Sequence, residues 1–132
     1  MRQLLEQERA QYALRCIDRL RQDPTKAAKY KIYVHELPAM VQMNGLGQAL
    51  AQIMSDYRKD KDGPAARQLM ADLQQWLVDE RRLYRLSQGQ DVLGALMSGD
   101  RASYMRAYEE IIRLCNWLKK LADAYIEGPA SA

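Results

Sequence analysis

Apolar side chains recur every three or four residues along most of the chain, which is the spacing of one face of an α-helix. The clearest stretch covers residues 100–127, whose apolar seam consists of Tyr104, Tyr108, Ile111, Cys115, Leu118, Ala122 and Tyr125. Asp100 is suited to cap the start of this helix, and Gly128 with Pro129 is suited to stop it. At about 1.5 Å per residue the helix would be about 40 Å long, so we expect an elongated domain.

The same spacing and the turn residues predict further helices. A first helix covers residues 1–22, and a second begins near Thr25 and breaks or kinks before Pro38, because proline disfavours helical geometry in the preceding residue. The remaining predicted helices are a short one over residues 38–44, one over residues 46–58, one after Gly63-Pro64 with a seam from Ala66 to Leu83, and one over residues 91–97. No alternating strand pattern and no internal repeat is found. Residues 1–132 are therefore predicted to form one all-α domain, an elongated bundle of about six helices with the long C-terminal helix at its centre.

The composition supports a folded chain without a membrane segment. Hydrophobic residues make up 48% and charged residues 28%, with 7 Gly and 4 Pro, which excludes a disordered or collagen-like chain. No apolar run reaches the ~20 residues of a membrane span, and the charged start lacks the core of a signal peptide. Two single cysteines, Cys16 and Cys115, lie on apolar seams and are expected in the core. We expect a cytoplasmic protein.

The residue types that carry catalysis or bind cofactors are scarce. His35 is the single histidine, so no multi-histidine metal site is available, and its apolar neighbours favour a structural role. A calcium loop over residues 58–69 is excluded, because Arg58 and Leu69 stand where carboxylates are needed. The glycines of residues 45–47 lack the third glycine and the preceding strand of a dinucleotide fingerprint. We therefore expect no enzyme, no metal and no cofactor.

Two charged residues interrupt the apolar seams. Arg9 falls on the inner face of the first helix, and Glu80 falls on the seam that begins at Ala66. An arginine that points into a core is usually paired. We expect Arg9 to contact a carboxylate across the bundle, with Glu80, Glu109 or Glu110 as the partner. The alternative is that Arg9 extends past the end of the apolar stripe into solvent.

The positive charge is concentrated near the start of the chain. The net charge is +3, but residues 9–31 contain seven cations against Asp18 and Asp23, a local charge of +5. Such a density attracts phosphate, although it is also typical of a solvated helix face. Tyr30 and Tyr33 are interleaved with lysines, as on RNA-binding surfaces where rings stack on bases. Their spacing with Leu37 favours instead an inner stripe, which leaves the lysines free to touch phosphate.

Three stretches carry a family resemblance: LEQERAQYALRCID at residues 5–18, KYKIYVHELPAMVQMNGLGQALA at residues 29–51, and YEEIIRLCNWLKKLADAY at residues 108–125. Their order and spacing resemble the small subunit of the type III-B CRISPR effector, the Cmr RNA-guided RNA-targeting complex. The most specific part is LPAMVQMNGLGQALA, residues 37–51. The NWLK of residues 116–119 supports it.

The resemblance implies an all-α, non-catalytic subunit whose neighbouring copies stack along the interior of the ribonucleoprotein. There it would lie beside the backbone subunit and help to form the channel in which guide RNA and target RNA pair, while other subunits cleave. The expected RNA contact is independent of sequence, because cations meet phosphate oxygens while base pairing carries the specificity.

The candidate phosphate contacts are chosen by local charge, since the family motifs do not mark them. The first set is Arg15, Arg19, Lys26, Lys29 and Lys31, and the second is Arg81, Arg82 and Arg85, expected at the end of the helix that follows Pro64. The alternative function is a helical protein–protein adaptor that touches no RNA. In that case the methionines at positions 40, 43 and 54 would belong partly to an exposed docking face.

Overall fold

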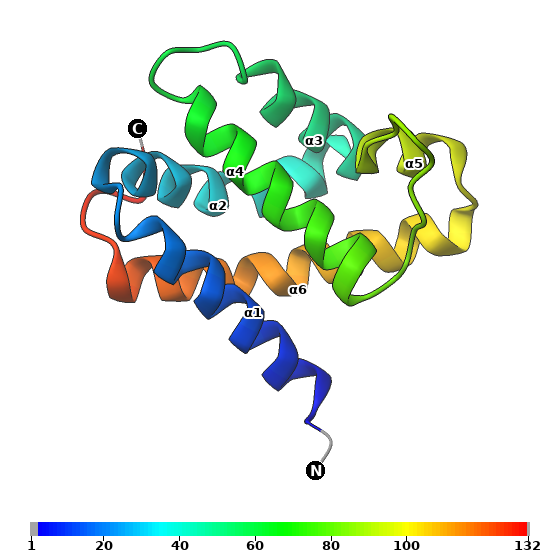
Figure 1. The fold of residues 1–132 in the computed structure, drawn as a ribbon, viewed down its shortest axis with the longest axis horizontal. Coiled ribbons are helices and arrows are strands. Elements are labelled where there is room, and N and C mark those ends of the chain that lie inside the picture. Colours follow the sequence, from blue (N-terminus) through cyan, green and yellow to red (C-terminus); the bar gives the residue numbers. More distant parts are fainter. Residues whose placement is uncertain (1–2, 132) are drawn as a thin grey trace.

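A computed structural model describes residues 3–131, which form six α-helices and one π-helix. The helices are α1 (Leu5–Leu20), α2 (Pro24–Asn44), α3 (Leu46–Ser55), α4 (Gly63–Gln74), which continues directly into the π-helix η1 (Gln75–Glu80), α5 (Val92–Ser98) and α6 (Arg101–Tyr125). The described residues contain no strand, so the predicted all-α fold is confirmed (Figure 1). Residues 1–2 of the predicted first helix lie outside the described part of the chain.

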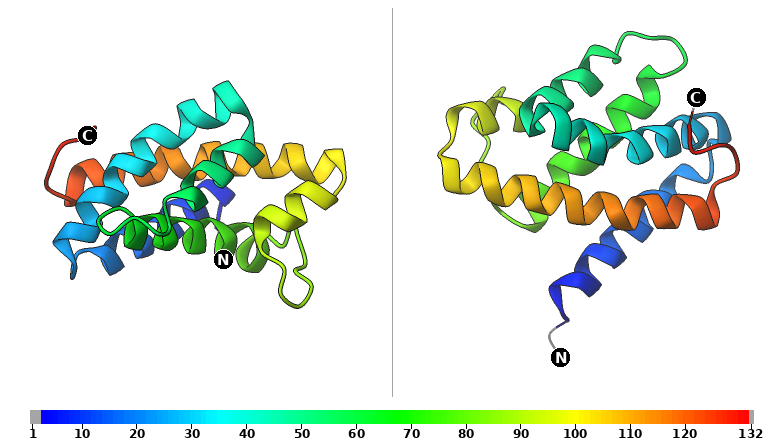
Figure 2. Two further views of the ribbon diagram at one scale, coloured as in Figure 1. Left: turned by 90° about the horizontal axis from the view of Figure 1, so that it is seen from above. Right: turned by 180° about the vertical axis from the view of Figure 1, so that it is seen from behind.

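The long helix α6 spans the molecule, and the helices α1 and α2 pack against it (Figure 2). Helix α2 in turn packs against α3 and α4, so it lies between α6 and the α3–α4 pair. The N-terminal turns of α1 project beyond the rest of the bundle (Figure 1). This arrangement buries α2 on several sides, which explains why its apolar residues do not form a single stripe.

Buried aromatic and thiol side chains lie where the seams predicted them. Tyr12 and Tyr30 are fully buried, and Cys16 and Cys115 are buried free thiols, as expected. The side chains of Tyr30 and Tyr33 face the core and not solvent, which confirms the inner stripe. Both hydroxyl groups have hydrogen-bond acceptors inside the bundle. Tyr30 donates to Asp72 Oδ2 at 2.7 Å, and Tyr33 donates to Asp56 Oδ2 at the C-terminal end of α3.

The helix ends follow the capping residues. Asp100 Oδ1 accepts a hydrogen bond from the Ser103 amide at 2.7 Å, which fixes the start of α6 as predicted. Gly45 has φ +88 and joins α2 to α3, a conformation that residues with a side chain rarely adopt. The predicted turn at Asn44-Gly45 is therefore confirmed.

The predicted break before Pro38, with a separate helix over residues 38–44, is wrong, because α2 continues through Pro38 to Asn44. Proline within a helix costs about 3 kcal/mol through the lost hydrogen bond and the clash of its ring. Val34, Leu37 and Val41 on either side of it are fully buried, and each gains about 1.5–3 kcal/mol from burial. Tertiary packing therefore outweighs the local preference.

The helix after Pro64 also differs from its prediction, because it ends at Glu80 in a π-helix and does not reach Leu83. The Arg81 amide donates to the Trp76 carbonyl at 2.8 Å, five residues back, which is the wider π spacing. Extra residues in this last turn shift the seam. Glu80 is consequently exposed and does not face the core.

Candidate nucleic-acid interface

The eight predicted phosphate contacts lie in three different settings. Four of them follow one side of the α1–α2 region, and we call these the α1–α2 row: Arg15, Arg19, Lys26 and Lys29. Three come directly after η1, and we call these the arginine segment: Arg81, Arg82 and Arg85. The eighth, Lys31, is buried.

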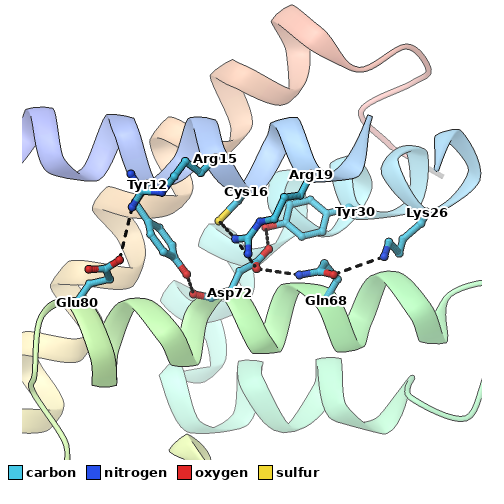
Figure 3. Close-up of polar contacts among 9 residues, drawn as sticks. All are labelled: Tyr12, Arg15, Cys16, Arg19, Lys26, Tyr30, Gln68, Asp72 and Glu80. Atoms are coloured by element: carbon cyan, nitrogen blue, oxygen red, sulfur yellow. Dashed lines mark hydrogen bonds and ion pairs between the residues drawn. The ribbon is translucent and has the colours of Figure 1, made fainter. Parts of the chain in front are cut away.

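Each member of the α1–α2 row meets a polar partner from another element, three of them on α4 and η1 (Figure 3). The contacts are Arg15 to Glu80 at 3.5 Å, Arg19 to Asp72 at 3.5 Å, Lys26 to Gln68 at 3.5 Å and Lys29 to Asp62 at 3.5 Å. The row therefore has counter-charges or acceptors supplied from within the molecule.

Asp72 is the centre of this polar network and is almost completely buried, with 2% of its side chain exposed. Burial raises the pKa of Asp72, and hydrogen bonds from the Tyr30 hydroxyl and the Gln68 amide oppose that rise. The Arg19 guanidinium lies over the same carboxylate at 3.5 Å (Figure 3). Arg19 is the cation that pairs with this buried carboxylate within residues 3–131, and it is therefore held in place by the pair.

The positions of apolar residues in α4 indicate this network, although counting the charges of residues 9–31 does not. Asp72 stands three residues after Leu69 and directly before Leu73, both fully buried, so an acidic residue lies on the inner face of the helix. A buried carboxylate requires donors from neighbouring elements. Arg19 and Tyr30 are those donors.

Lys31 is not at the surface, which corrects its place among the candidate contacts. Its side chain is 8% exposed, and the ammonium donates to the carbonyl oxygens of Ile126 and Gly128 at 2.9 Å each. These carbonyls follow the end of α6, where backbone acceptors lack helical partners. The C-terminal segment folds back over Lys31, a tertiary contact that no local pattern reveals. Lys31 consequently binds the chain itself.

The predicted partner of Arg9 is confirmed as Glu110. The Arg9 guanidinium donates to both carboxylate oxygens, from Nε at 3.1 Å and from Nη2 at 2.8 Å, and Trp76 Nε1 donates at 3.2 Å. Burial acts to raise the pKa of Glu110, but the hydrogen bond and charge of Arg9 outweigh it and lower the pKa. Arg81 lies 3.7 Å from the same carboxylate. This site is a buried ion pair between α1 and α6.

Arg82 and Arg85 have a different environment. Both are exposed, and within residues 3–131 neither forms an ion pair. They line a cleft of about 530 Å³, whose other walls are Val78, Asp79, Leu83, Tyr84 and Leu86. Arg82 has φ +54, a backbone conformation that is unusual for a residue with a side chain. The two guanidinium groups are therefore available to an external anion.

Comparison with known proteins decides the family. Residues 5–125 match the model of the family described as CRISPR-associated protein (Cas_Cmr5). The chain belongs to the Cmr5 family. The X-ray crystal structure of a CRISPR-associated Cmr5 family protein from Thermus thermophilus is similar, with 28% identity and a TM-score of 0.73 over 95% of this chain and 100% of that chain. The Cmr5 family chain is a small subunit of the type III-B Cmr complex, as the resemblance implied.

The arrangement of charges in this Cmr5 family member changes the meaning of its basic segment. Six of the seven cations in residues 9–31 lie 2.8–3.8 Å from a carboxylate oxygen. Most of these carboxylates come from outside the segment, on α4, η1, α6 and the loop before α4. The local charge of +5 along the chain is therefore largely neutralised in space.

The single histidine of the Cmr5 family chain makes an interhelical contact. His35 Nε2 lies 2.7 Å from Asp123 Oδ1, which ties α2 to α6. Within residues 3–131 no group of three or more histidine, cysteine, aspartate or glutamate side chains is placed to hold a metal ion. None of the described helices is long and apolar enough to cross a membrane.

Proposed function

We propose that this small subunit is non-catalytic and stacks along the channel in which guide RNA and target RNA pair, where it contributes to RNA binding and to assembly of the Cmr complex in antiviral defence. The observation that carries the proposal is the family match over residues 5–125. Its partners would be the other Cmr subunits, including the backbone subunit, and neighbouring copies of itself. Such a complex works in the cytoplasm, where the target transcripts are.

The proposed RNA contact is a set of cations that meet phosphate oxygens without reading bases. The exposed or partly exposed candidates are Arg15, Arg19, Lys26, Lys29, Arg82 and Arg85. Arg81 contributes less, because its guanidinium lies against Glu110, and Lys31 is withdrawn because its ammonium is buried. Sequence specificity would then come entirely from guide–target pairing.

A non-catalytic role agrees with the state of the nucleophilic side chains. Burial raises the pKa of the Cys16 and Cys115 thiols, in each case to about 12. Both thiols therefore stay protonated at neutral pH and are poor nucleophiles. Asp123 holds His35 in a contact between α2 and α6, at 2.7 Å from its carboxylate oxygen. Cleavage would belong to other subunits of the complex.

Reconstitution tests the proposal. The Cmr complex is assembled from its other subunits and a guide RNA, with and without this chain, and its affinity for a complementary target RNA is measured at several salt concentrations. We expect the chain to increase target affinity and to steepen its decrease with salt, because each phosphate contact releases counterions. Equal affinity and equal salt dependence with and without the chain would contradict RNA contact.

The same experiment addresses the alternative, a protein–protein adaptor without RNA contact. The ion pairing of the α1–α2 row favours that alternative, as does the side chain of Met43, which is 81% exposed. The other two methionines of the expected docking face, Met40 and Met54, are partly buried against the core. An adaptor would join the other subunits equally well after the RNA has been digested by a nuclease. It would also leave the salt dependence of target binding unchanged.

A further inference from the structure

The chain leaves η1 through an unusual turn. The Leu83 amide donates to the Leu77 carbonyl at 2.8 Å, and Arg82 lies between the helix end and Leu83 with φ +54. This is the position after a helix where glycine is common, because a side chain there costs about 1–3 kcal/mol in backbone strain. It is the only non-glycine residue with positive φ in the described chain. Strain of this kind is typical of functional sites, as are π-helices.

The strained turn places Arg82 in the lining of one cleft together with Arg85. The cleft has a volume of about 530 Å³ and is open to solvent, so a group on the surface of a large ligand can enter it. Arg82 and Arg85 are three residues apart, so their α-carbons are at most about 11 Å apart. Both side chains line the same cleft, so both guanidinium groups can meet one ligand.

The charges in the cleft define the ligand. Arg82 and Arg85 stand against a single acid, Asp79, so one positive charge remains. A single phosphodiester carries one negative charge and offers two non-bridging oxygens to arginine donors. Val78, Leu83 and Leu86 add apolar walls, which suit the ribose that adjoins a phosphate. An acidic protein surface would also be attracted by this charge, and the co-purification measurement below distinguishes it from RNA.

We propose that this cleft binds a phosphodiester group of RNA through Arg82 and Arg85, and that it is a stronger phosphate contact than the α1–α2 row. The proposal rests on the proposed function, namely that the subunit touches RNA in the complex. A phosphate at Arg15, Lys29 or Arg19 must compete with Glu80, Asp62 or the buried Asp72 respectively, and only Lys26 of the row has a neutral partner, Gln68. A phosphate at the cleft displaces no ion pair of residues 3–131.

The test compares two double variants that each remove two positive charges. Arg82→Ala with Arg85→Ala empties the cleft of cations. Arg58→Ala with Lys61→Ala is the matched control, because both residues are exposed in the α3–α4 loop, at the opposite end of α4 and η1 from the cleft (Figure 1). Each variant is reconstituted into the Cmr complex. Co-purification with the other subunits, thermal melting, and target RNA affinity at several salt concentrations are measured.

We expect the cleft variant to fold and assemble, to bind target RNA roughly tenfold or more weakly, and to lose about 0.7–0.9 from the slope of log affinity against log salt. Arg82→Lys with Arg85→Lys, which keeps the charges, should retain most of the slope. The control variant should match the wild type in all three measurements.

Three results would overturn the proposal in distinguishable ways. If the wild-type chain raises target affinity and the cleft variant does so equally, the cleft does not hold RNA while the proposed function stands. If the cleft variant fails to co-purify although it melts like the wild type, the cleft binds an acidic protein surface. If the wild-type chain itself has no effect on target affinity or salt slope, the proposed function fails, and the cleft proposal fails with it.

Discussion

The two cationic regions of the molecule contain similar residues but differ in what surrounds them. The α1–α2 row lies on packed helices, where α4, η1 and the loop before α4 bring polar partners to 3.5 Å. Arg82 and Arg85 lie after the end of η1, in a segment without regular structure, and meet no acid within 4 Å in the described chain. The number of cations in a stretch of sequence therefore does not measure how many can bind a ligand.

Helix packing is the physical source of this difference. A helix in a bundle presents its flanks to neighbouring helices, and polar side chains at the edge of the apolar stripe meet across the gap. In the irregular segment after η1, Arg81 still meets Glu110, but Arg82 and Arg85 form no ion pair within residues 3–131. The predictions that follow test whether the paired cations are structural and the unpaired ones functional.

The largest expected effect comes from the most buried pair. Glu110→Gln should lower the free energy of unfolding by about 3–5 kcal/mol at neutral pH, because Arg9, whose side chain is 10% exposed, then lacks a counter-charge. Denaturant unfolding measures the change. Glu109→Gln is the control, since Glu109 pairs with Arg113 at the surface and should matter by less than about 1 kcal/mol. Equal effects of the two variants would contradict a structural role for the Arg9–Glu110 pair.

The same pair predicts a pH dependence with a defined sign. Burial opposes ionisation of Glu110, but Arg9 lowers its pKa below the ordinary value of 4.5. The stabilisation is therefore complete above pH 4.5 and is lost as the pH falls through the lowered pKa. The stability difference between wild type and Glu110→Gln should accordingly shrink below pH 4.5. A difference that stays constant down to acid unfolding would rule out this linkage.

Lys31→Met should have the next largest effect, and only on stability. The loss of two hydrogen bonds from the ammonium to the carbonyls of Ile126 and Gly128 should cost about 2 kcal/mol in unfolding free energy. Target RNA affinity in the reconstituted complex should not change. The comparison variant is Lys29→Met, at a partly exposed pair with Asp62, which should change stability by less than about 1 kcal/mol. If Lys31→Met is as stable as the wild type but binds RNA more weakly, Lys31 contacts RNA phosphate and its role is not structural.

Arg82→Gly should separate stability from binding. Glycine tolerates the positive φ of this turn, so we expect the variant to be about 0.5–1 kcal/mol more stable than the wild type. It should at the same time bind target RNA more weakly, because one cleft guanidinium is lost. Thermal melts and binding titrations are run on the same preparations. The hypothesis is that Arg82 costs stability but is kept because its guanidinium binds RNA. An Arg82→Gly variant that is less stable than the wild type, or that binds RNA with wild-type affinity, would contradict it.

The smallest effects are expected at the exposed end of the α1–α2 row. The side chains of Arg15 and Glu80 are 59% and 38% exposed and 3.5 Å apart, so Arg15→Gln should change stability by less than about 1 kcal/mol. Glu80→Gln should slightly increase target RNA affinity, because it frees Arg15 for phosphate. Binding titrations at low salt give the best sensitivity. A large loss of RNA affinity in Arg15→Gln would reverse the ranking of the two regions.

Much of the fold could be predicted from local patterns. The spacing of apolar residues located the helices, and Asp100 and Asn44-Gly45 marked ends of two of them because capping and turn chemistry act within a few residues. The break at Pro38 was wrong because the burial of its neighbours is a tertiary term. The π-helix before Arg81 was missed for the same reason, since no local signal separates it from an α-helix that continues.

The candidate site could be predicted only in part. An inward arginine implies a carboxylate partner, so the pairing of Arg9 followed from burial alone, with Glu110 among the possible partners. Summing the charges of residues 9–31 did not show that Asp72, Glu80 and Asp62 approach that segment in space. Nor could it show that the C-terminal segment covers Lys31.

The sequence by itself determined the all-α class, the apolar seams, the buried thiols and the family, because periodicity, side-chain type and motif order are properties of neighbouring residues. Only the tertiary structure decided which cations remain available. Coulomb interactions act through space over a few ångströms and ignore distance along the chain. Acids from α4, η1 and α6 thus neutralise the basic segment of α1 and α2, while the turn after η1 leaves Arg82 and Arg85 without a partner in the described chain.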